Sequence, residues 1–321
     1  MYNTTELKAA VEQHIENLGL DQRKPANLYQ PMAYILSLKG KRIRPILTLL
    51  AYQAVSGANP MKAMNLAVAV EVFHNFTLVH DDIMDRAPVR RGNATVHIKW
   101  NENIAILSGD ALLAFSMDLV TGDFPERAAP LMKEYTRVSL AVCEGQMEDM
   151  DLALQEHATI PDYLEMIRKK TAVLLGGCMS LGSLAGGADE EIVGQFREFG
   201  ESLGIGFQLQ DDLMDAFPPE GFGKQVGGDI IENKKTYLLL KAQELADPSQ
   251  RKTIAALMAE NSDSKVEKML EIFRQLDIES HTQALIHRYF EKAKYLGQAL
   301  SQKTHFEPLR SYLQEIASRK I

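Results

Sequence analysis

Two triplets of aspartate carry the strongest chemical signal in this sequence. Each ends an apolar stretch with the spacing DDxxD, and the six residues are Asp81, Asp82 and Asp85, then Asp211, Asp212 and Asp215. On a helix, the first and third aspartates of such a motif lie one turn apart on one face. The C-terminal end of a helix carries partial negative charge, so each acid there costs roughly 0.3 to 1 kcal/mol and requires a positive partner.

A divalent metal ion suits both motifs as that partner. Mg2+ prefers oxygen ligands, keeps several of its waters and bridges to substrate phosphates. For the first motif alone, a solvated acidic helix end paired with Arg86 and Arg90 explains the pattern equally well. The second copy favours the metal, because two such helix ends lying together would hold several Mg2+ ions around a diphosphate. Such ions would act as Lewis acids and stabilise the charge of a departing pyrophosphate. The predicted reaction class is therefore ionisation of a diphosphate ester.

The segment GKRIRP, residues 40–45, indicates a second anion site that needs no metal. It places Lys41, Arg42 and Arg44 in the first turn of the next helix, where backbone amides already attract anions. A solvated basic turn is the alternative interpretation. The segment gains weight because it accompanies two acidic motifs.

Two residues on the approach to the first motif are candidates for a cavity lining. His74 lies seven residues before Asp81, hence two turns earlier on nearly the same face, although a satisfied core histidine is the alternative. Phe76 lies five residues before Asp81, about 7 Å deeper along the helix axis. It is a candidate floor for a cavity that opens at the acidic end, and an ordinary core phenylalanine is the alternative.

Charged residues also interrupt two apolar helical stretches. Lys169, Lys170 and Thr171 lie within MIRKKTAVLLGG, and a buried lysine requires an anionic partner unless its stem carries the ammonium to solvent. The acids of GQMEDMD, residues 145–151, lack the DDxxD spacing and are interpreted mainly as a polar helix face, with Gln146 a candidate cavity contact.

A polar loop follows the second acidic motif. Residues 217–235 contain four glycines together with Lys224 and Lys234. A mobile segment of this kind can close over a site and exclude water, and disorder without function is the alternative.

The remaining pattern is helical throughout and predicts an all-α fold. Helices are expected over residues 4–18, 27–38, 43–56, 61–85, 101–121, 125–153, 160–185, 234–246, 249–260, 264–302 with breaks, and 307–319. Pro88 is expected to end the helix of the first motif. No linker or repeat interrupts the 321 residues, so one large domain is predicted.

Composition narrows the partners and the compartment. The formal charge of −8 without a basic stripe argues against nucleic acid. Cys143 and Cys178 are isolated in apolar helical context, as expected for reduced thiols of a cytoplasmic protein. The N-terminal stretch is polar and amphipathic rather than a signal peptide, and no membrane span is expected.

In order, the segments GKRIRP, HNFTLVHDDIMDRAPVRRG, RKKTAVL, FQLQDDLMD and FGKQVGGDIIENKKT closely resemble those of the trans-isoprenyl diphosphate synthases, the polyprenyl synthetase family. The resemblance covers nearly the whole chain and its paired motifs are specific. It implies one isoprenyl diphosphate synthase domain over residues 1–321, an all-α helical bundle of the isoprenoid synthase type around a deep central cavity, and a homodimer.

The reaction implied by the resemblance is a head-to-tail condensation. Isopentenyl diphosphate would add to an allylic diphosphate, namely dimethylallyl, geranyl or farnesyl diphosphate, after its ionisation to a carbocation. The isopentenyl double bond would attack, and a proton would pass to the released pyrophosphate. Three Mg2+ ions per site are expected with substrate bound. Because bulk water would quench a carbocation, the loop and apolar walls gain a physical purpose.

Roles for individual positions also follow from the resemblance alone. Direct Mg2+ ligands would be Asp81, Asp85 and Asp211, supported by Asp82, Asp212 and Asp215. Contacts to the allylic diphosphate would come from Arg90, Lys170, Thr171, Gln208, Lys224 and Lys234, with Lys170 counted among the catalytic residues. Contacts to isopentenyl diphosphate would come from Lys41, Arg44, His74 and Arg91.

Two departures from the family pattern bear on specificity. Lys39-Gly40 stands where many members have Gly-Gly, a change expected to be tolerated. The first aspartate motif has no two-residue insertion, unlike common bacterial farnesyl diphosphate synthases, and it carries Phe76 followed by the smaller Thr77. One aromatic floor with a small neighbour suggests a product of fifteen to twenty carbons, the farnesyl to geranylgeranyl range.

Three rival functions share parts of the pattern. A class I terpene cyclase has the first DDxxD but normally replaces the second, and it has no use for Lys41, Arg44 and His74. A non-catalytic prenyltransferase subunit typically loses one acidic motif, and both are intact here. A metal phosphohydrolase using His80 and Asp81 would leave the second motif unexplained.

Overall fold

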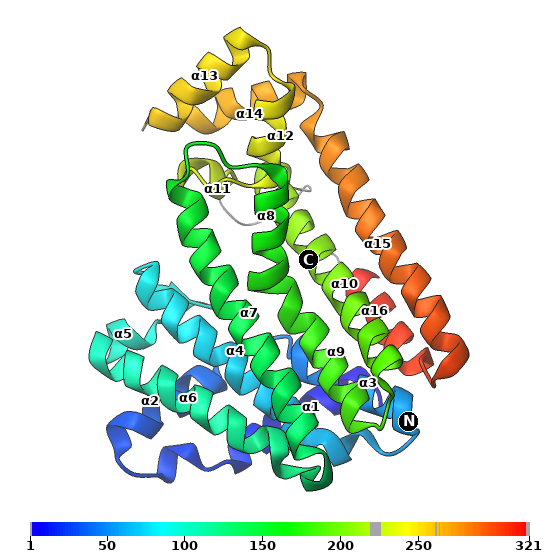
Figure 1. The fold of residues 1–321 in the computed structure, drawn as a ribbon. Helices are drawn as coiled ribbons and strands as arrows, with labels where there is room; N and C mark the ends of the chain where they lie inside the picture. Colours follow the sequence, from blue (N-terminus) through cyan, green and yellow to red (C-terminus); the bar gives the residue numbers. More distant parts are fainter. Residues whose placement is uncertain (1, 219–225, 261, 263, 319–321) are drawn as a thin grey trace. The chain divides into compact units, whose positions relative to one another are not determined.

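Helices form nearly all of the computed structural model, which describes residues 2–218, 226–260, 262 and 264–318. The first helices are α1 (Thr4–Asn17), α2 (Ala26–Ser37), α3 (Ile43–Ser56), α4 (Met64–Met84), α5 (Val96–Lys99), α6 (Glu102–Gly122) and α7 (Ala128–Leu154). The others are α8 (Ile160–Ile167), α9 (Val173–Ala185), α10 (Glu190–Ala216), α11 (Gly228–Ile231), α12 (Tyr237–Leu245), α13 (Pro248–Ala259), α14 (Lys265–Gln275), α15 (Ile278–Lys303) and α16 (Glu307–Ser318). The predicted all-α class is confirmed (Figure 1).

Short elements complete the description. Turns of 3-10 helix are η1 (Leu20–Gln22), η2 (Pro60–Ala63) and η3 (Pro125–Arg127), and η4 (Arg168–Ala172) is a π-helical turn. In the described part of the chain, the only sheet is a two-stranded antiparallel hairpin of β1 (Val89–Arg90) and β2 (Asn93–Ala94).

The chain divides into two compact units, whose boundaries fall inside α7, α9, α10 and α15 rather than in linkers. Unit 1 contains residues 1–136, 177–196 and 299–321, and unit 2 contains residues 137–176 and 197–298. The predicted single domain over residues 1–321 stays a prediction. The first acidic motif belongs to unit 1 and the second to unit 2, so each is described within its own unit.

In unit 1 the apolar helix α4 packs along α6 and also contacts α3. Phe73 on α4 is 1% exposed, and its ring meets the Tyr135 ring edge-on at 5.6 Å between centroids. Burying aromatic and aliphatic side chains of this size contributes roughly 1.5 to 3 kcal/mol each. This burial holds α4 in place along its length, so its acidic C-terminal end is carried on a rigid element.

The end of α4 differs from the prediction that Pro88 stops it. Arg86 adopts a left-handed conformation with φ 52°, and its amide bonds to Ile83 O at 3.2 Å while the Ala87 amide bonds to Asp82 O at 2.9 Å. These two bonds are the Schellman arrangement that closes a helix. The helix therefore ends at Met84, before Pro88 could act. Its start is also later than predicted, because residues 60–63 form the turn η2.

Unit 2 packs around a second apolar core. Side chains of α8, α10, α12 and α14 contribute, including Leu209, Leu240 and Phe273, each 4% exposed or less. The helix predicted over residues 160–185 is broken at η4, where one extra residue per turn is accommodated. Two glycines make room for this wide turn: a Cβ added to Gly145 would lie 2.2 Å from Lys170 N, and one added to Gly204 would lie 2.6 Å from Ala172 Cα.

Helix α6 also bears on the prediction that no segment spans a membrane. It is the one described helix whose length and mean hydropathy, 1.6 over an 18-residue window, would allow a span, and 39% of that window is buried. The helix itself was predicted over residues 101–121, but its hydropathy was not singled out. Because core helices pass the same test, the hydropathy of α6 is weak evidence for a membrane span.

Candidate active site

The first acidic motif occupies the last turn of α4 in unit 1. Asp82 is 1% exposed, and both of its carboxylate oxygens accept from Arg90 Nε, at 2.9 and 2.8 Å. Asp85 is the exposed C-terminal cap, while Asp81 is half-buried one turn before it. The motif thus separates into a buried, ion-paired aspartate and two that retain access to solvent. Arg90 is the expected positive partner of the helix end, and its Nη2 lies 2.7 Å from the carboxylate of the middle acid.

The hairpin of β1 and β2 positions the two arginines. Arg91 and Gly92, its two central residues, have φ of 52° and 76°. Positive φ at both positions is typical of the type I′ turn, whose twist matches the flanking strands. The Arg91 guanidinium packs against Gly40, where an added Cβ would lie 2.8 Å from Nη1. The hairpin therefore directs Arg90 to the acidic motif and Arg91 to the GKRIRP segment.

A cluster of cations surrounds His74 in unit 1. Arg44 Nη1 donates to His74 Nε2 at 3.1 Å, so Nδ1 carries the proton in this arrangement. Burial, and then the charges of Arg44, Arg91 and Arg90, hold the pKa of His74 well below its usual value. Arg44 Nε is buried and makes no hydrogen bond to the described residues. The cluster is therefore a set of fixed positive charges around a neutral imidazole, which suits an anion.

Arg42 has a different role from the one predicted for the GKRIRP segment. It is 5% exposed, and its guanidinium donates to Glu71 Oε1 at 2.6 Å and to the Leu36 and Leu38 carbonyls at 2.6 and 3.1 Å. Its backbone is left-handed, with φ 52°, at the N-cap of α3. Arg42 is therefore a buried structural residue, whereas its neighbour Lys41 is exposed.

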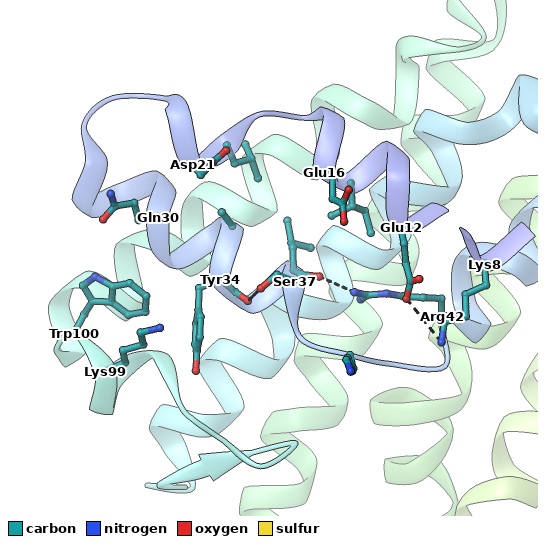
Figure 2. A pocket seen from close by; sticks show the side chains of 15 residues that line it. Lys8, Glu12, Glu16, Asp21, Gln30, Tyr34, Ser37, Arg42, Lys99 and Trp100 are labelled. Atoms are coloured by element: carbon teal, nitrogen blue, oxygen red, sulfur yellow. Dashed lines mark hydrogen bonds and ion pairs between the residues drawn. The ribbon is translucent and has the colours of Figure 1, made fainter. Parts of the chain in front are cut away.

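A cavity of about 830 Å3 is lined by Arg42 and by Lys39, which precedes this segment. Figure 2 shows Arg42 in its wall. Its wall also includes Tyr34 and Trp100, and the Lys99 ammonium lies 3.6 Å from the Tyr34 ring centroid. Of the three cations predicted for the anion site at GKRIRP, only Arg42 lines this cavity. Arg44 and His74, whose contact lies at the centre of the cation cluster, do not line it.

Phe76 and Thr77 lie at the midpoint of α4. Phe76 is 8% exposed, and its ring lies 4.8 Å from the His80 ring and 5.5 Å from the Phe73 ring. Thr77 is half-buried, and its hydroxyl donates to the His74 carbonyl at 2.8 Å. The aromatic pair places Phe76 in the core of unit 1, and its role as a cavity floor stays a prediction.

The second acidic motif ends α10 in unit 2. Asp212 is 6% exposed, accepts from the Tyr163 hydroxyl, and accepts from Gln208 Nε2 at 3.0 Å. Burial raises the pKa of Asp212 to about 7, because its two donors carry no charge to offset the lost solvation. Asp211 is exposed. As in the first motif, the middle aspartate is buried and the first one faces solvent.

Asp215 holds the segment that follows the motif. Its two carboxylate oxygens accept from the Gly228 amide at 3.1 Å and the Asp229 amide at 3.0 Å. Its own carbonyl accepts from the Gly227 amide at 2.8 Å. Asp215 therefore anchors the start of α11 to the end of α10. Lys224 lies outside the described residues, and nothing is assigned to it.

The lysines near this motif are paired with acids. Lys170 Nζ lies 2.5 Å from Asp149 Oδ2, and Lys169 Nζ lies 3.1 Å from Glu144. The acids of the stretch 145–151, predicted mainly as a polar face, thus include the anionic partner that Lys170 requires. Lys234 is more exposed and pairs with Asp229 at 3.1 Å and Glu232 at 2.9 Å.

The remaining predicted contacts of unit 2 form a chain of hydrogen bonds. Thr171 Oγ1 donates to Gln208 Oε1 at 3.2 Å, and Gln208 in turn donates to Asp212. The π-helical turn η4 carries both Lys170 and Thr171, and such turns occur frequently at functional sites. Sequence periodicity overlooked this turn and also Tyr163, which lies 49 positions from its partner Asp212.

The carboxylates suit Mg2+ as a metal that is shared with substrate. Among the described residues, no group of three His, Cys, Asp or Glu side chains lies close enough to hold a metal ion unaided. Mg2+ usually binds to one or two carboxylates and completes its shell with waters and substrate phosphates. Asp81 with Asp85, and Asp211, offer oxygens of this kind at rigid helix ends.

Comparisons with known proteins converge on one family. Residues 25–276 match the family model described as "Polyprenyl synthetase". A geranylgeranyl diphosphate synthase of Methanosarcina mazei is 42% identical over 69% of each chain, and a geranylgeranyl pyrophosphate synthase of Geoglobus acetivorans is 36% identical over 97% of this chain and 95% of that one. The crystal structure of a geranylgeranyl pyrophosphate synthetase from Pyrococcus horikoshii Ot3 superposes with a TM-score of 0.90 at 30% identity, covering 99% of this chain and 97% of that one.

Proposed function

The chain belongs to the polyprenyl synthetase family, and we propose that it condenses isopentenyl diphosphate with an allylic diphosphate to give a short-chain trans-prenyl diphosphate and pyrophosphate. The observation that carries this proposal is the presence of two acidic motifs together with a separate cluster of cations around His74. Two diphosphates must bind, and only one of them loses its pyrophosphate. A metal-dependent site and a metal-free site meet that requirement.

The acidic motifs form the proposed site for the allylic diphosphate. Mg2+ bound there supplies Lewis-acid stabilisation of the departing pyrophosphate, and three ions per site are proposed with substrate bound. Asp81, Asp85 and Asp211 would provide the protein ligands, since all three retain solvent access. Lys170 and Lys234 would turn from their acidic partners toward the diphosphate when it binds, with Arg90, Thr171, Gln208 and Lys224 as further proposed contacts.

The cation cluster forms the proposed site for isopentenyl diphosphate. Arg44 and Arg91 would donate to phosphate oxygens, and Lys41 is exposed beside them. Because Arg44 Nε is buried without a partner among the described residues, an anion there would satisfy a donor that otherwise costs about 1 to 3 kcal/mol. His74 stays neutral and orients Arg44 rather than adding charge.

The product is proposed to contain fifteen to twenty carbons. Support comes from the names of the relatives and from Phe76, which lies below the acidic end of α4 and is followed by the small residue Thr77. Replacing Phe76 by Ala should lengthen the product by one or more five-carbon units, as measured by chromatography of the products. An unchanged product would remove Phe76 as the floor.

A homodimer is proposed, with α7 as its contact in unit 2. Leu140, Cys143, Met147, Met150 and Leu154 are exposed at alternating spacings of three and four. This is the spacing of a helix stripe that packs against another helix. Exposed apolar stripes of this kind mark interaction surfaces, and a second copy of α7 would cover this one. A cytoplasmic location is proposed because Cys143 and Cys178 form no disulfide.

The decisive test of the function supplies labelled isopentenyl diphosphate with dimethylallyl, geranyl or farnesyl diphosphate in separate reactions. Product is expected only when both substrates and Mg2+ are present. Cyclised hydrocarbon from the allylic substrate alone would identify a class I terpene cyclase. No turnover under any condition would favour a non-catalytic subunit.

A further inference from the structure

Tyr163 and Asp212 form a buried contact behind the second acidic motif. The Tyr163 hydroxyl donates to Asp212 Oδ2, and the two residues are 2% and 6% exposed. The other oxygen, Oδ1, accepts from Gln208 Nε2 at 3.0 Å. Each oxygen thus has a protein donor, and the carboxylate has almost no surface from which to reach an external ion.

This contact is the end of a longer chain of hydrogen bonds. Gln208 Oε1 accepts from Thr171 Oγ1 at 3.2 Å, and Thr171 lies in the π-helical turn η4 next to Lys170. The chain of Tyr163, Asp212, Gln208 and Thr171, here called the tyrosine relay, connects α8, the last turns of α10 and η4 within unit 2. Because Tyr163 and Asp212 are both buried, they form the inner end of the relay.

The inner end of the relay lies next to the exposed acid of the second motif on α10. Asp211 precedes Asp212 and is exposed, while Asp215 is engaged by the amides of Gly228 and Asp229. If Asp212 were not held inward, its carboxylate could turn to the exposed face beside that of Asp211, and the last turns of α10 could rotate. Both changes would alter the position of Asp211.

We propose that Tyr163 is a positioning residue whose hydroxyl keeps Asp212 in the core and thereby orients Asp211 toward Mg2+ and the allylic diphosphate. The inference rests on the proposed function, since it assigns Tyr163 to the metal-dependent site. Tyr163 itself touches neither metal nor substrate. It acts through Asp212, as residues behind metal ligands commonly do.

The test compares Tyr163→Phe with wild type in binding of inorganic pyrophosphate and Mg2+, measured by calorimetry on the full chain. Loss of the hydroxyl should weaken binding about tenfold, the lower end of the range for residues that support metal ligands. In steady-state assays, KM for the allylic diphosphate should rise in proportion. KM for isopentenyl diphosphate should stay unchanged, because its proposed site lies in unit 1.

A matched control is Tyr135→Phe. Tyr135 is also 2% exposed, and its hydroxyl bonds to Ser116, but it belongs to unit 1 and is not a member of the relay. This variant removes the same group from a comparable buried site. It should leave both KM values and pyrophosphate binding at the wild-type level, which distinguishes positioning from a general loss of packing.

Asp212→Asn keeps the test decisive if Tyr163→Phe does not fold. An amide at this position can accept from Gln208 and donate to the Tyr163 oxygen, so it preserves the relay while removing the charge. Its pyrophosphate affinity should fall less than that of Asp211→Asn, and a loss as large as that of Asp211→Asn would overturn the inference. Equal binding by Tyr163→Phe and wild type would overturn it also, whereas a wild-type protein that binds no pyrophosphate with Mg2+ would instead refute the proposed function.

Discussion

The two acidic motifs have the same spacing but different surroundings. In unit 1, Asp82 is buried against the charged guanidinium of Arg90, whereas in unit 2, Asp212 is buried against the neutral hydroxyl of Tyr163 and the amide of Gln208. The charged partner stabilises an ionised carboxylate directly. The neutral donors do so less well, and the pKa of Asp212 rises to about 7. The two motifs thus have the same sequence pattern, but their buried middle aspartates are held by different kinds of hydrogen-bond donor.

The third aspartates differ as well. Asp85 is an exposed cap at the negative end of α4, whereas Asp215 uses both carboxylate oxygens to hold the amides of Gly228 and Asp229. The motif in unit 1 therefore ends in an exposed carboxylate. The motif in unit 2 is fastened to the segment that follows it, which gives that segment a fixed end.

The largest effect is expected where the motifs are alike. Asp81→Ala and Asp211→Ala should each lower kcat/KM by roughly a thousandfold, about 4 kcal/mol of transition-state stabilisation, because each removes a proposed metal ligand. Asp118→Ala removes an exposed acid on α6, outside both motifs, and should leave steady-state kinetics unchanged. A large loss from only one of the two motifs would show that they do not act together.

Removing the buried partner of the middle aspartate should lower the free energy of unfolding more in unit 1 than in unit 2. Arg90→Ala leaves Asp82 buried without its counter-charge and should lower the free energy of unfolding by about 3 kcal/mol. Tyr163→Phe removes a neutral donor and should cost about 1 to 2 kcal/mol. Arg168→Ala, which breaks partly exposed ion pairs with Glu165 and Glu201, should cost less than about 1 kcal/mol in the same urea titrations. Equal costs for Arg90 and Tyr163 would remove the distinction.

Replacing the third aspartate by alanine should change the free energy of unfolding in opposite directions in the two motifs. Asp215→Ala should lower the free energy of unfolding by about 1 kcal/mol and speed hydrogen exchange at Gly228 and Asp229, because both amides lose their acceptor. Asp85→Ala should raise stability by roughly 0.3 to 1 kcal/mol, since it removes an acid from a helix C-terminus. Unaltered exchange in Asp215→Ala would mean that the amides are held by other contacts.

The smallest effect concerns pH and the cation cluster of unit 1. The pKa of His74 is depressed in the folded protein, so the unfolded chain binds its proton more tightly below the ordinary value of 6.5. Stability from this residue is present above pH 6.5 and is lost as pH falls, by at most about 1.4 kcal/mol per pH unit. Thermal unfolding from pH 8 to 5.5 should therefore show a shallower decline for His74→Gln than for wild type. Identical slopes would contradict a neutral His74.

Sequence periodicity predicted the helices that carry both motifs because their apolar faces are long and regular. It did not predict η4, since a single wide turn leaves the apolar pattern on either side intact. Arg42 and Lys41 also could not be distinguished from composition. The left-handed backbone of Arg42 turns it toward Glu71, 29 positions away, while Lys41 stays exposed.

The residue types of the candidate site could be predicted from the sequence, but the partners that hold the buried aspartates could not. Arg90 was predicted both as a partner of the acidic helix end and as a contact to the allylic diphosphate. The structure shows its pairing with Asp82, and the substrate contact stays a prediction. Tyr163 had no local signal at all, because a tyrosine in an apolar helix resembles any core residue. Long-range hydrogen bonds of this kind follow from packing, which the sequence does not report directly.

The most direct test of the whole account is a crystal structure of the protein with Mn2+ in place of Mg2+ and inorganic pyrophosphate. Anomalous scattering would locate each metal ion independently of the protein chain. We predict ions about 2.1 Å from carboxylate oxygens of both Asp81 and Asp211, bound to one shared pyrophosphate. Ions attached to only one motif, with the other facing away, would contradict it.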